Sequence, residues 1–157
     1  MKTSVQNITM STNIKNTNKR ISVYQNLLLF TAGGIIYGAM EVVYREYTHI
    51  SMFITGGLCF LLIGAIRHLK RDIPVTVRML MGALMITLLE FICGLIVNLW
   101  LELDVWCYAH ERANLLGQIC LHASAIWFFL SFLAVYLDIF MRKRMFGEPT
   151  APIRILP

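Results

Sequence analysis

Residues 75–100, VTVRMLMGALMITLLEFICGLIVNLW, decide the fold class of this chain. The stretch is 26 residues long and holds only two charged side chains, Arg78 near its start and Glu90 within it. A helix of about 20 apolar residues is enough to cross about 30 Å of hydrocarbon, at about 1.5 Å per residue. The stretch therefore predicts a membrane-spanning helix.

The composition of the whole chain agrees with this interpretation. Of its 157 residues, 57% are hydrophobic and 15% are charged, and the mean hydropathy is +0.64. A soluble domain usually carries about 25% charged residues. The composition argues against a soluble globule, a disordered or fibrous chain and a nucleic-acid-binding protein. The length indicates a single domain, which we expect to share its apolar surface with the lipid bilayer.

The apolar residues form four blocks, which predict an all-α integral membrane protein with a bundle of four transmembrane helices. The expected spans are 27–44, 50–66, 75–100 and 119–141, within a transmembrane domain of residues 25–146. Residues 1–24, rich in Asn, Thr, Ser and Lys, are expected to be a disordered tail, and 147–157 a second tail. The short turn at 45–49 forces the first two helices into an antiparallel hairpin, because backbone polar groups must stay paired in lipid.

The basic residues predict the orientation of the chain. Twelve of the fourteen Lys and Arg residues fall in the two tails or near the second connection, and only Arg45 and Arg112 fall on the other side. The positive-inside rule then places both termini in the cytoplasm of a multi-pass protein of the plasma membrane. The connection 101–118 would be external, and its Trp106 and Tyr108 suggest that it is partly embedded.

Polar residues near the end of the first span form one candidate site. Glu41, Arg45 and His49 follow at four-residue steps, so a continuous helix would place them on one face with opposite charges adjacent. Gly34 and Gly38 form a GxxxG pair that permits close helix packing. The pattern fits either an interfacial ion pair beside a packing groove or a contact for a ligand or ion near the outer mouth.

Glu90 is the second candidate, because it lies deep in the third span. A carboxylate at that depth costs a few kcal/mol at least, so it should be protonated, paired or facing water. Gly94 and Asn98 follow at four-residue steps and extend a polar, small-residue stripe that we expect to face the bundle interior. Hydrogen bonding between helices and a substrate or proton site are both open. Asp138 and Arg142 are interpreted as a helix-end ion pair.

The cysteines and histidines predict neither a metal site nor a catalytic centre. Cys107 with His110 and Cys120 with His122 lack the spacing of a standard zinc site, and a disulfide between the two cysteines is left open. No P-loop, nucleophile-elbow, zinc-protease or dinucleotide pattern occurs in the sequence. We expect no cofactor, no metal and no enzymatic activity.

Three stretches carry a resemblance to a known family: REYTHISMFITGGLCFLLIGAI (45–66), LLEFICGLIVNLWLELDVWCYAHERANLLGQICL (88–121) and LDIFMRKRMFGE (137–148). In order and spacing the chain resembles the small bacterial membrane proteins of the ABC-transporter type IV family, or CmpB-like ABC transporter permeases, over about 38–148. Its most specific part is W-x-Y followed by N-L-x-G-Q-I-C. The resemblance implies a multi-pass, permease-like protein.

Carried over by position, the resemblance assigns family residues to the first hairpin, the third helix and the external loop. They are Arg45, Thr48, His49, Ser51, Gly56 and Gly57, then Glu90, Gly94 and Asn98, then Trp106, Tyr108, Asn114, Gly117, Gln118 and Cys120. The chain departs from the family where Cys107 replaces a usual aspartate, His122 a usual proline and Glu46 a usual glycine. If the aspartate that Cys107 replaces has a role in relatives, this chain lacks the side chain for that role.

Two functions remain at this point. The first is a transport-related, permease-like subunit without its own ATPase domain, which would need a homo-oligomer or other membrane or ATPase subunits as partners. The alternative is a non-transporting membrane sensor or assembly protein whose polar residues only hold helices together.

Overall fold

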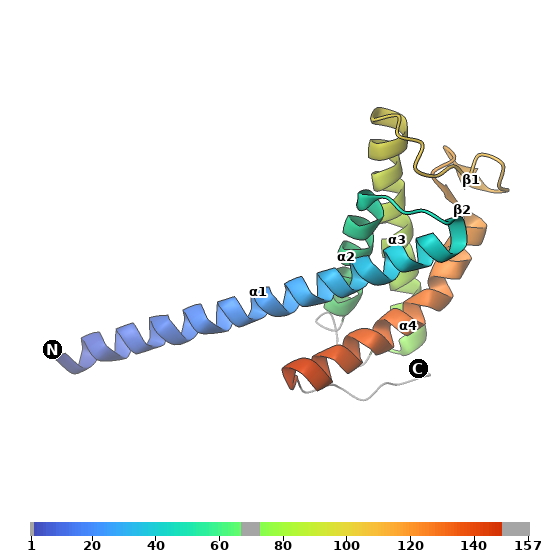
Figure 1. Cartoon of the computed structure of the whole chain (residues 1–157). Helices are drawn as coiled ribbons and strands as arrows, with labels where there is room; N and C mark the ends of the chain where they lie inside the picture. Colours follow the sequence, from blue (N-terminus) through green and yellow to red (C-terminus); the bar gives the residue numbers. More distant parts are fainter. Residues whose placement is uncertain (1, 67–72, 149–157) are drawn as a thin grey trace.

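The computed structural model describes residues 2–66 and 73–148, with side chains from Ser22 onward, and this part of the chain is mostly helical. Figure 1 shows the elements in order, α1 (Lys2–Arg45), α2 (Ile50–Ala65), α3 (Val75–Gly94), the π-helical turn η2 (Leu95–Trp100), β1 (Asn114–Leu115), β2 (Ile119–Cys120) and α4 (Leu121–Phe146). The prediction of a mostly helical fold is confirmed for the described residues. The two short strands pair antiparallel within the connection between α3 and α4.

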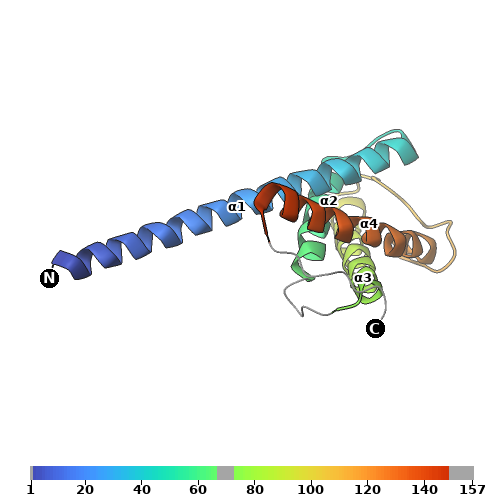
Figure 2. The same ribbon diagram turned by 90° about the horizontal axis from the view of Figure 1, so that it is seen from below.

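The helices alternate in direction through the bundle. The connections after α1 and after α3 lie at one end, and the end of α2, the start of α3 and the end of α4 lie at the other (Figure 1). Viewed from below, α1 and α4 run obliquely across α2 and α3 (Figure 2). This alternation is what a chain must do if it crosses a bilayer repeatedly with short connections.

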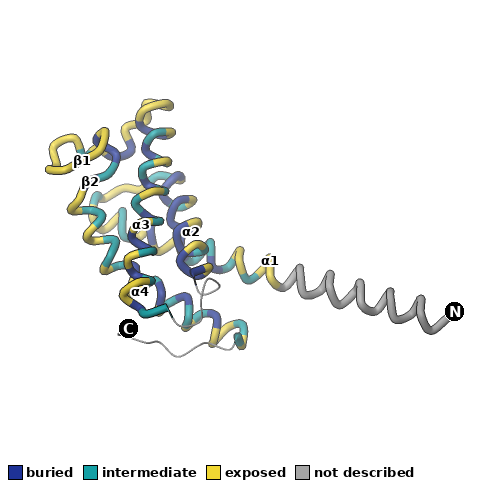
Figure 3. Tube along the Cα trace, turned by 180° about the vertical axis from the view of Figure 1, so that it is seen from behind, coloured by how far each residue is buried: buried dark blue, intermediate teal, exposed yellow. Residues whose placement is uncertain are grey.

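Three helices are long and apolar enough to span a membrane: Ser22–Arg45 within α1, Val75–Trp100, and α4. The fourth predicted span is the shorter helix α2, whose 16 residues reach about 24 Å. Large apolar side chains of α1, α3 and α4 point outward, and Figure 3 shows exposed positions on the outer faces around a buried interior. Such outer faces fit a lipid environment.

The N-terminal segment differs from the sequence prediction. Residues 1–24 were expected to be disordered, whereas the backbone of α1 is helical from Lys2. Extending an existing helix adds one hydrogen bond for each residue fixed, without a new nucleation cost, so a polar segment can continue an apolar helix. Of the predicted C-terminal tail 147–157, residues 149–157 lie outside the described residues.

Glycines bring α1 and α2 close together. We call this contact the glycine seam; it consists of Gly33, Gly34, Gly56 and Gly57. A Cβ atom at Gly34 would lie 2.6 Å from the carbonyl oxygen of Phe53, whereas one at Gly38 would meet nothing nearer than Thr48 Oγ1 at 3.7 Å. The prediction that Gly34 and Gly38 both lie in a close helix contact is therefore wrong for Gly38. The close approach involves adjacent glycines because the two helices meet over a short crossing.

Candidate functional site

Glu90 lies at the centre of the bundle and joins three helices. The Tyr37 hydroxyl of α1 donates a hydrogen bond to Glu90 Oε1 at 2.5 Å, and Trp127 Nε1–H of α4 donates to Glu90 Oε2 at 2.6 Å. Glu90 is only 2% exposed. The Tyr37 and Trp127 rings stack on each other with their centroids 5.3 Å apart. The prediction that Glu90 faces the bundle interior is confirmed, and each carboxylate oxygen has its own donor.

The other two residues of the predicted stripe, Gly94 and Asn98, contact the loop between α3 and α4. Asn98 lies in η2, where Nδ2 donates to Gln118 Oε1 at 2.7 Å and to the Trp106 carbonyl at 3.0 Å, and Oδ1 accepts from Val105 N–H at 2.7 Å. A Cβ atom at Gly94 would lie 2.5 Å from Gln118 Oε1. Gly94 therefore makes room for Gln118, and Asn98 fixes the start of the loop.

The other residues of the family-like motif also stabilise this loop. Trp106 is buried and its Nε1–H donates to the Gln118 carbonyl at 2.9 Å. Asn114 donates to the Glu111 carbonyl at 2.7 Å and accepts from Gly117 N–H at 3.0 Å. Gly117 has a φ of +68°, which glycine adopts without steric cost. The geometry assigns Asn98, Trp106, Asn114 and Gln118 positions inside a hydrogen-bonded loop structure.

Tyr108 lies within this loop and lines a cavity. Burial is the main cause that raises the pKa of the Tyr108 hydroxyl, and the negative charge of Glu90 adds to it. The hydroxyl therefore stays protonated at neutral pH. Its oxygen and ring contribute to the cavity wall as neutral groups.

Glu41 and Arg45 form the predicted ion pair, but His49 does not join them. Arg45 Nη1 also donates to the Val105 carbonyl at 2.8 Å, which connects α1 to the loop between α3 and α4. The helix ends at Arg45, and His49 caps α2 instead, where its Nδ1 accepts from Ser51 N–H at 3.2 Å. The expected single face was wrong for His49 because the chain turns before reaching it.

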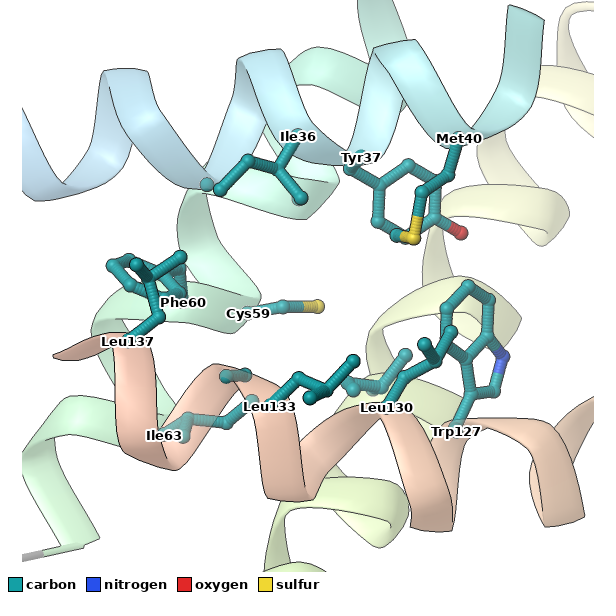
Figure 4. A pocket seen from close by; sticks show the side chains of 14 residues that line it. Ile36, Tyr37, Met40, Cys59, Phe60, Ile63, Trp127, Leu130, Leu133 and Leu137 are labelled. Atoms are coloured by element: carbon teal, nitrogen blue, oxygen red, sulfur yellow. The ribbon is translucent and has the colours of Figure 1, made fainter. Parts of the chain in front are cut away.

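Two cavities lie between α1 and α4. The outer cavity, about 210 Å³ in volume, is lined by Tyr37, Met40, Glu41, Tyr44, Tyr108, Glu111, Cys120, His122, Ala123, Ile126, Trp127 and Leu130. The inner cavity, about 130 Å³, is lined by Gly33, Ile36, Tyr37, Met40, Gly56, Cys59, Phe60, Ile63, Ile86, Trp127, Leu130, Leu133, Ala134 and Leu137. Figure 4 shows Tyr37, Met40 and Trp127 gathered at one end of the inner cavity.

A second buried charge cluster lies at the opposite end of the bundle. Arg142 Nε donates to Asp138 Oδ1 at 2.8 Å, and Arg142 Nη1 lies 3.5 Å from Glu148 Oε1. Asp138 and Arg142 are 3% and 5% exposed, because the pair packs where Gly64 has no side chain. The ion pair was predicted, but its burial was not.

The structure also adds residues that the sequence did not single out. Tyr37 and Trp127 are aromatic residues within apolar runs, and nothing in their spacing marks them as partners of Glu90. The cysteines are free thiols, with Cys107 exposed and Cys120 buried, so the disulfide that the sequence left open is not formed. Within the described ranges, no three His, Cys, Asp or Glu side chains are grouped as metal ligands would be.

A family model described as Putative ABC-transporter type IV matches residues 16–151. The chain belongs to this family. The match covers most of the chain, including α2, α3, α4 and the greater part of α1, and it extends beyond the 38–148 of the resemblance. No curated protein and no solved structure matches the chain. Family membership and the three apolar helices together make the chain a membrane protein related to ABC transporters.

Proposed function

We propose that this chain is a permease-like subunit of a transport system in the plasma membrane, with four transmembrane helices and both termini in the cytoplasm. It acts as a homo-oligomer or together with other membrane or ATPase subunits, and it is not itself an enzyme. Family membership supports the link to transport. The orientation rests on the distribution of basic residues.

One observation carries the proposal: a carboxylate is buried among three helices, next to two cavities. An ionisable side chain within a membrane span is costly, and such residues commonly mark substrate, ion or proton pathways. Glu90 is held by Tyr37 and Trp127, and these two side chains also line both cavities. Movement of either ring would therefore change both the environment of Glu90 and the connection between the cavities.

A partner is part of the proposal because the described bundle encloses two separate small cavities of about 130 and 210 Å³. The sequence also holds no P-loop pattern, so ATP hydrolysis would come from another subunit. The loop 101–118 is too firmly hydrogen-bonded to Asn98, through Val105 and Gln118, to serve as an easily opened lid.

The test is purification of the tagged chain from its native membrane in mild detergent, followed by assay of ATP hydrolysis and of solute uptake after reconstitution into vesicles. We expect an ATPase to purify with the chain and its activity to change in Glu90→Gln, while Glu102→Gln, at an exposed loop position, leaves the activity as in the wild type. If the preparation shows neither ATP hydrolysis nor solute uptake, and Glu90→Gln does not differ from the wild type, the sensor or assembly role is favoured.

A further inference from the structure

We propose that the outer and inner cavities form one binding site for an amphipathic organic cation, with the positive head in the outer cavity and the apolar tail in the inner cavity. This inference rests on the proposed transport role and names its substrate class.

The two cavities are adjacent along the α1–α4 interface. Four residues line both of them: Tyr37, Met40, Trp127 and Leu130. The stacked rings of Tyr37 and Trp127, together with the flexible Met40 side chain, form the boundary between the two spaces (Figure 4). A single elongated molecule that passes this boundary would contact both cavities.

The inner cavity suits an apolar tail. Its wall away from the boundary is formed by aliphatic and aromatic side chains such as Phe60, Ile63 and Leu137, and among its described lining residues none is charged. Ile36 and Leu133 also line it and remain partly exposed on the outer surface, at 39% and 60%. The cavity therefore opens toward the side of the bundle that faces lipid, where an amphipath would arrive.

The outer cavity suits a positive head. Two carboxylate residues, Glu41 and Glu111, line it, and none of its described lining residues is Lys or Arg. Arg45 offsets the charge of Glu41, but Glu111 is exposed, and the Glu90 carboxylate lies one hydrogen bond beyond the Tyr37 and Trp127 side chains. The balance of these charges is negative, which attracts cations and repels anions.

Aromatic rings strengthen this preference. Tyr37, Tyr44, Tyr108 and Trp127 line the outer cavity, and a cation over such ring faces gains about 0.5–2 kcal/mol. The Tyr37 O–H and Trp127 N–H groups both donate to Glu90, and this hydrogen bonding polarises the two rings and makes their faces more negative. A quaternary ammonium group, which cannot itself donate a hydrogen bond, fits a wall of ring faces and carboxylates better than a polar neutral head would.

The test measures equilibrium binding of octyltrimethylammonium to the full chain in phosphatidylcholine nanodiscs, with empty nanodiscs subtracted. Octanesulfonate, with the same tail and the opposite charge, should bind at least about tenfold more weakly. Glu111→Gln should weaken ammonium binding about threefold, as expected for one exposed charge, whereas Glu102→Gln in the same loop should not change it.

The tail position has its own matched pair of variants. Ile36→Trp fills the mouth of the inner cavity from a partly exposed position, and it should weaken octyltrimethylammonium binding at least about tenfold, to the level of tetramethylammonium. Ile35→Trp changes the neighbouring, 59% exposed residue, which does not line either cavity, and should bind as the wild type does. Equal binding of the sulfonate, or equal effects of the two tryptophan variants, would overturn the proposal.

These outcomes are independent of the transport assay, because binding is measured at equilibrium on the purified chain. Selective binding of the ammonium without ATPase or uptake would support the site and contradict the transport role. If instead the wild type takes up solute, Glu90→Gln loses that uptake and no ammonium binds, the transport role is supported and the proposed site is contradicted. Tight but charge-independent binding of both amphipaths would identify the groove as a slot for lipid chains.

Discussion

At the scale of single residues, Glu90 is the group on which the bundle interior depends. Both of its oxygens accept hydrogen bonds, from Tyr37 O–H and Trp127 N–H. A glutamine offers one carbonyl oxygen for Trp127, and the Tyr37 hydroxyl can rotate to accept from the amide NH₂ group. We therefore expect Glu90→Gln to fold and assemble normally even if it loses activity.

Glu90→Leu should be strongly destabilising, because it leaves two buried donors without acceptors. Each unsatisfied group costs about 1–3 kcal/mol, so the free energy of unfolding should fall by about 2–6 kcal/mol. Adding Tyr37→Phe to Glu90→Leu removes one of the orphaned donors and should recover part of that loss. Thermal unfolding of the three proteins in detergent measures this, and a double variant that is no more stable than Glu90→Leu would contradict the assignment.

Glu46 is a residue whose backbone conformation predicts a stabilising substitution. It follows the end of α1 with a φ of +65°, in the left-handed region that glycine favours. Glu46→Gly should raise the free energy of unfolding by about 1 kcal/mol by removing this strain. Glu46→Ala removes the charge but keeps the Cβ atom, so it should not stabilise the protein. Equal stabilisation by both would point to charge instead of backbone strain.

The sequence located Glu90 in the interior, but it did not identify its partners. The cost of exposing a carboxylate to lipid rises with its depth in the span, and that depth can be counted along the chain. Tyr37 and Trp127 become partners only through the relative rotation of α1, α3 and α4, which no local pattern specifies. For the same reason the Glu41–Arg45 pair within one helix was predictable, whereas the contact of Arg45 with the Val105 carbonyl was not.

At the scale of helices, the glycine seam determines how closely α1 and α2 pack. A Cβ atom at Gly56 would lie 2.9 Å from the Gly33 carbonyl oxygen and 2.8 Å from the Tyr37 ring. Gly56→Ala should therefore push the helices apart and destabilise the protein by about 1–3 kcal/mol. It should also disturb the Tyr37 hydrogen bond to Glu90.

Gly38→Ala is the matched control for Gly56→Ala, because the added methyl group would meet nothing nearer than 3.7 Å. Alanine also favours the helix over glycine by about 1 kcal/mol, so this variant should be neutral or slightly more stable. Unfolding midpoints in the same detergent compare the two proteins. If Gly38→Ala is the more damaging substitution, the seam is assigned to the wrong residues.

Helix boundaries were predicted well where the apolar pattern ends sharply and poorly where a polar segment continues a helix. The third span was predicted as 75–100, and α3 with η2 covers the same residues. The π-helical turn was not predictable, because it depends on the hydrogen bonds of Asn98 to the loop. Likewise α4 begins at Leu121, because the preceding residues pair as strands.

At the scale of the whole molecule, the distribution of charge agrees with the alternating direction of the helices. Basic and acidic residues lie at opposite ends of the bundle. The basic residues Arg142, Lys143 and Arg144 end α4 at the same end of the bundle where α2 ends and α3 begins. The loop between α3 and α4, with Glu102, Asp104 and Glu111, lies at the opposite end. If the positive-inside rule holds, the end with the basic residues faces the cytoplasm.

Cys107 provides a natural reporter for this orientation, because it is exposed in the loop between α3 and α4. Cys59 and Cys120 are buried, and Cys93 is half-buried within α3. A membrane-impermeant maleimide should label the wild-type protein in intact cells, and Cys107→Ser should abolish that labelling. Lys15→Cys in the Cys107→Ser background should react only after the cells are lysed, because positive-inside topology places the N-terminal segment in the cytoplasm. The reverse pattern, with position 15 labelled in intact cells and Cys107 protected until lysis, would invert the topology and place the outer cavity on the cytoplasmic side. Because the acidic cavity lies at the end of the bundle that carries Cys107, the same experiment decides from which side an amphipathic cation would enter the head-group site.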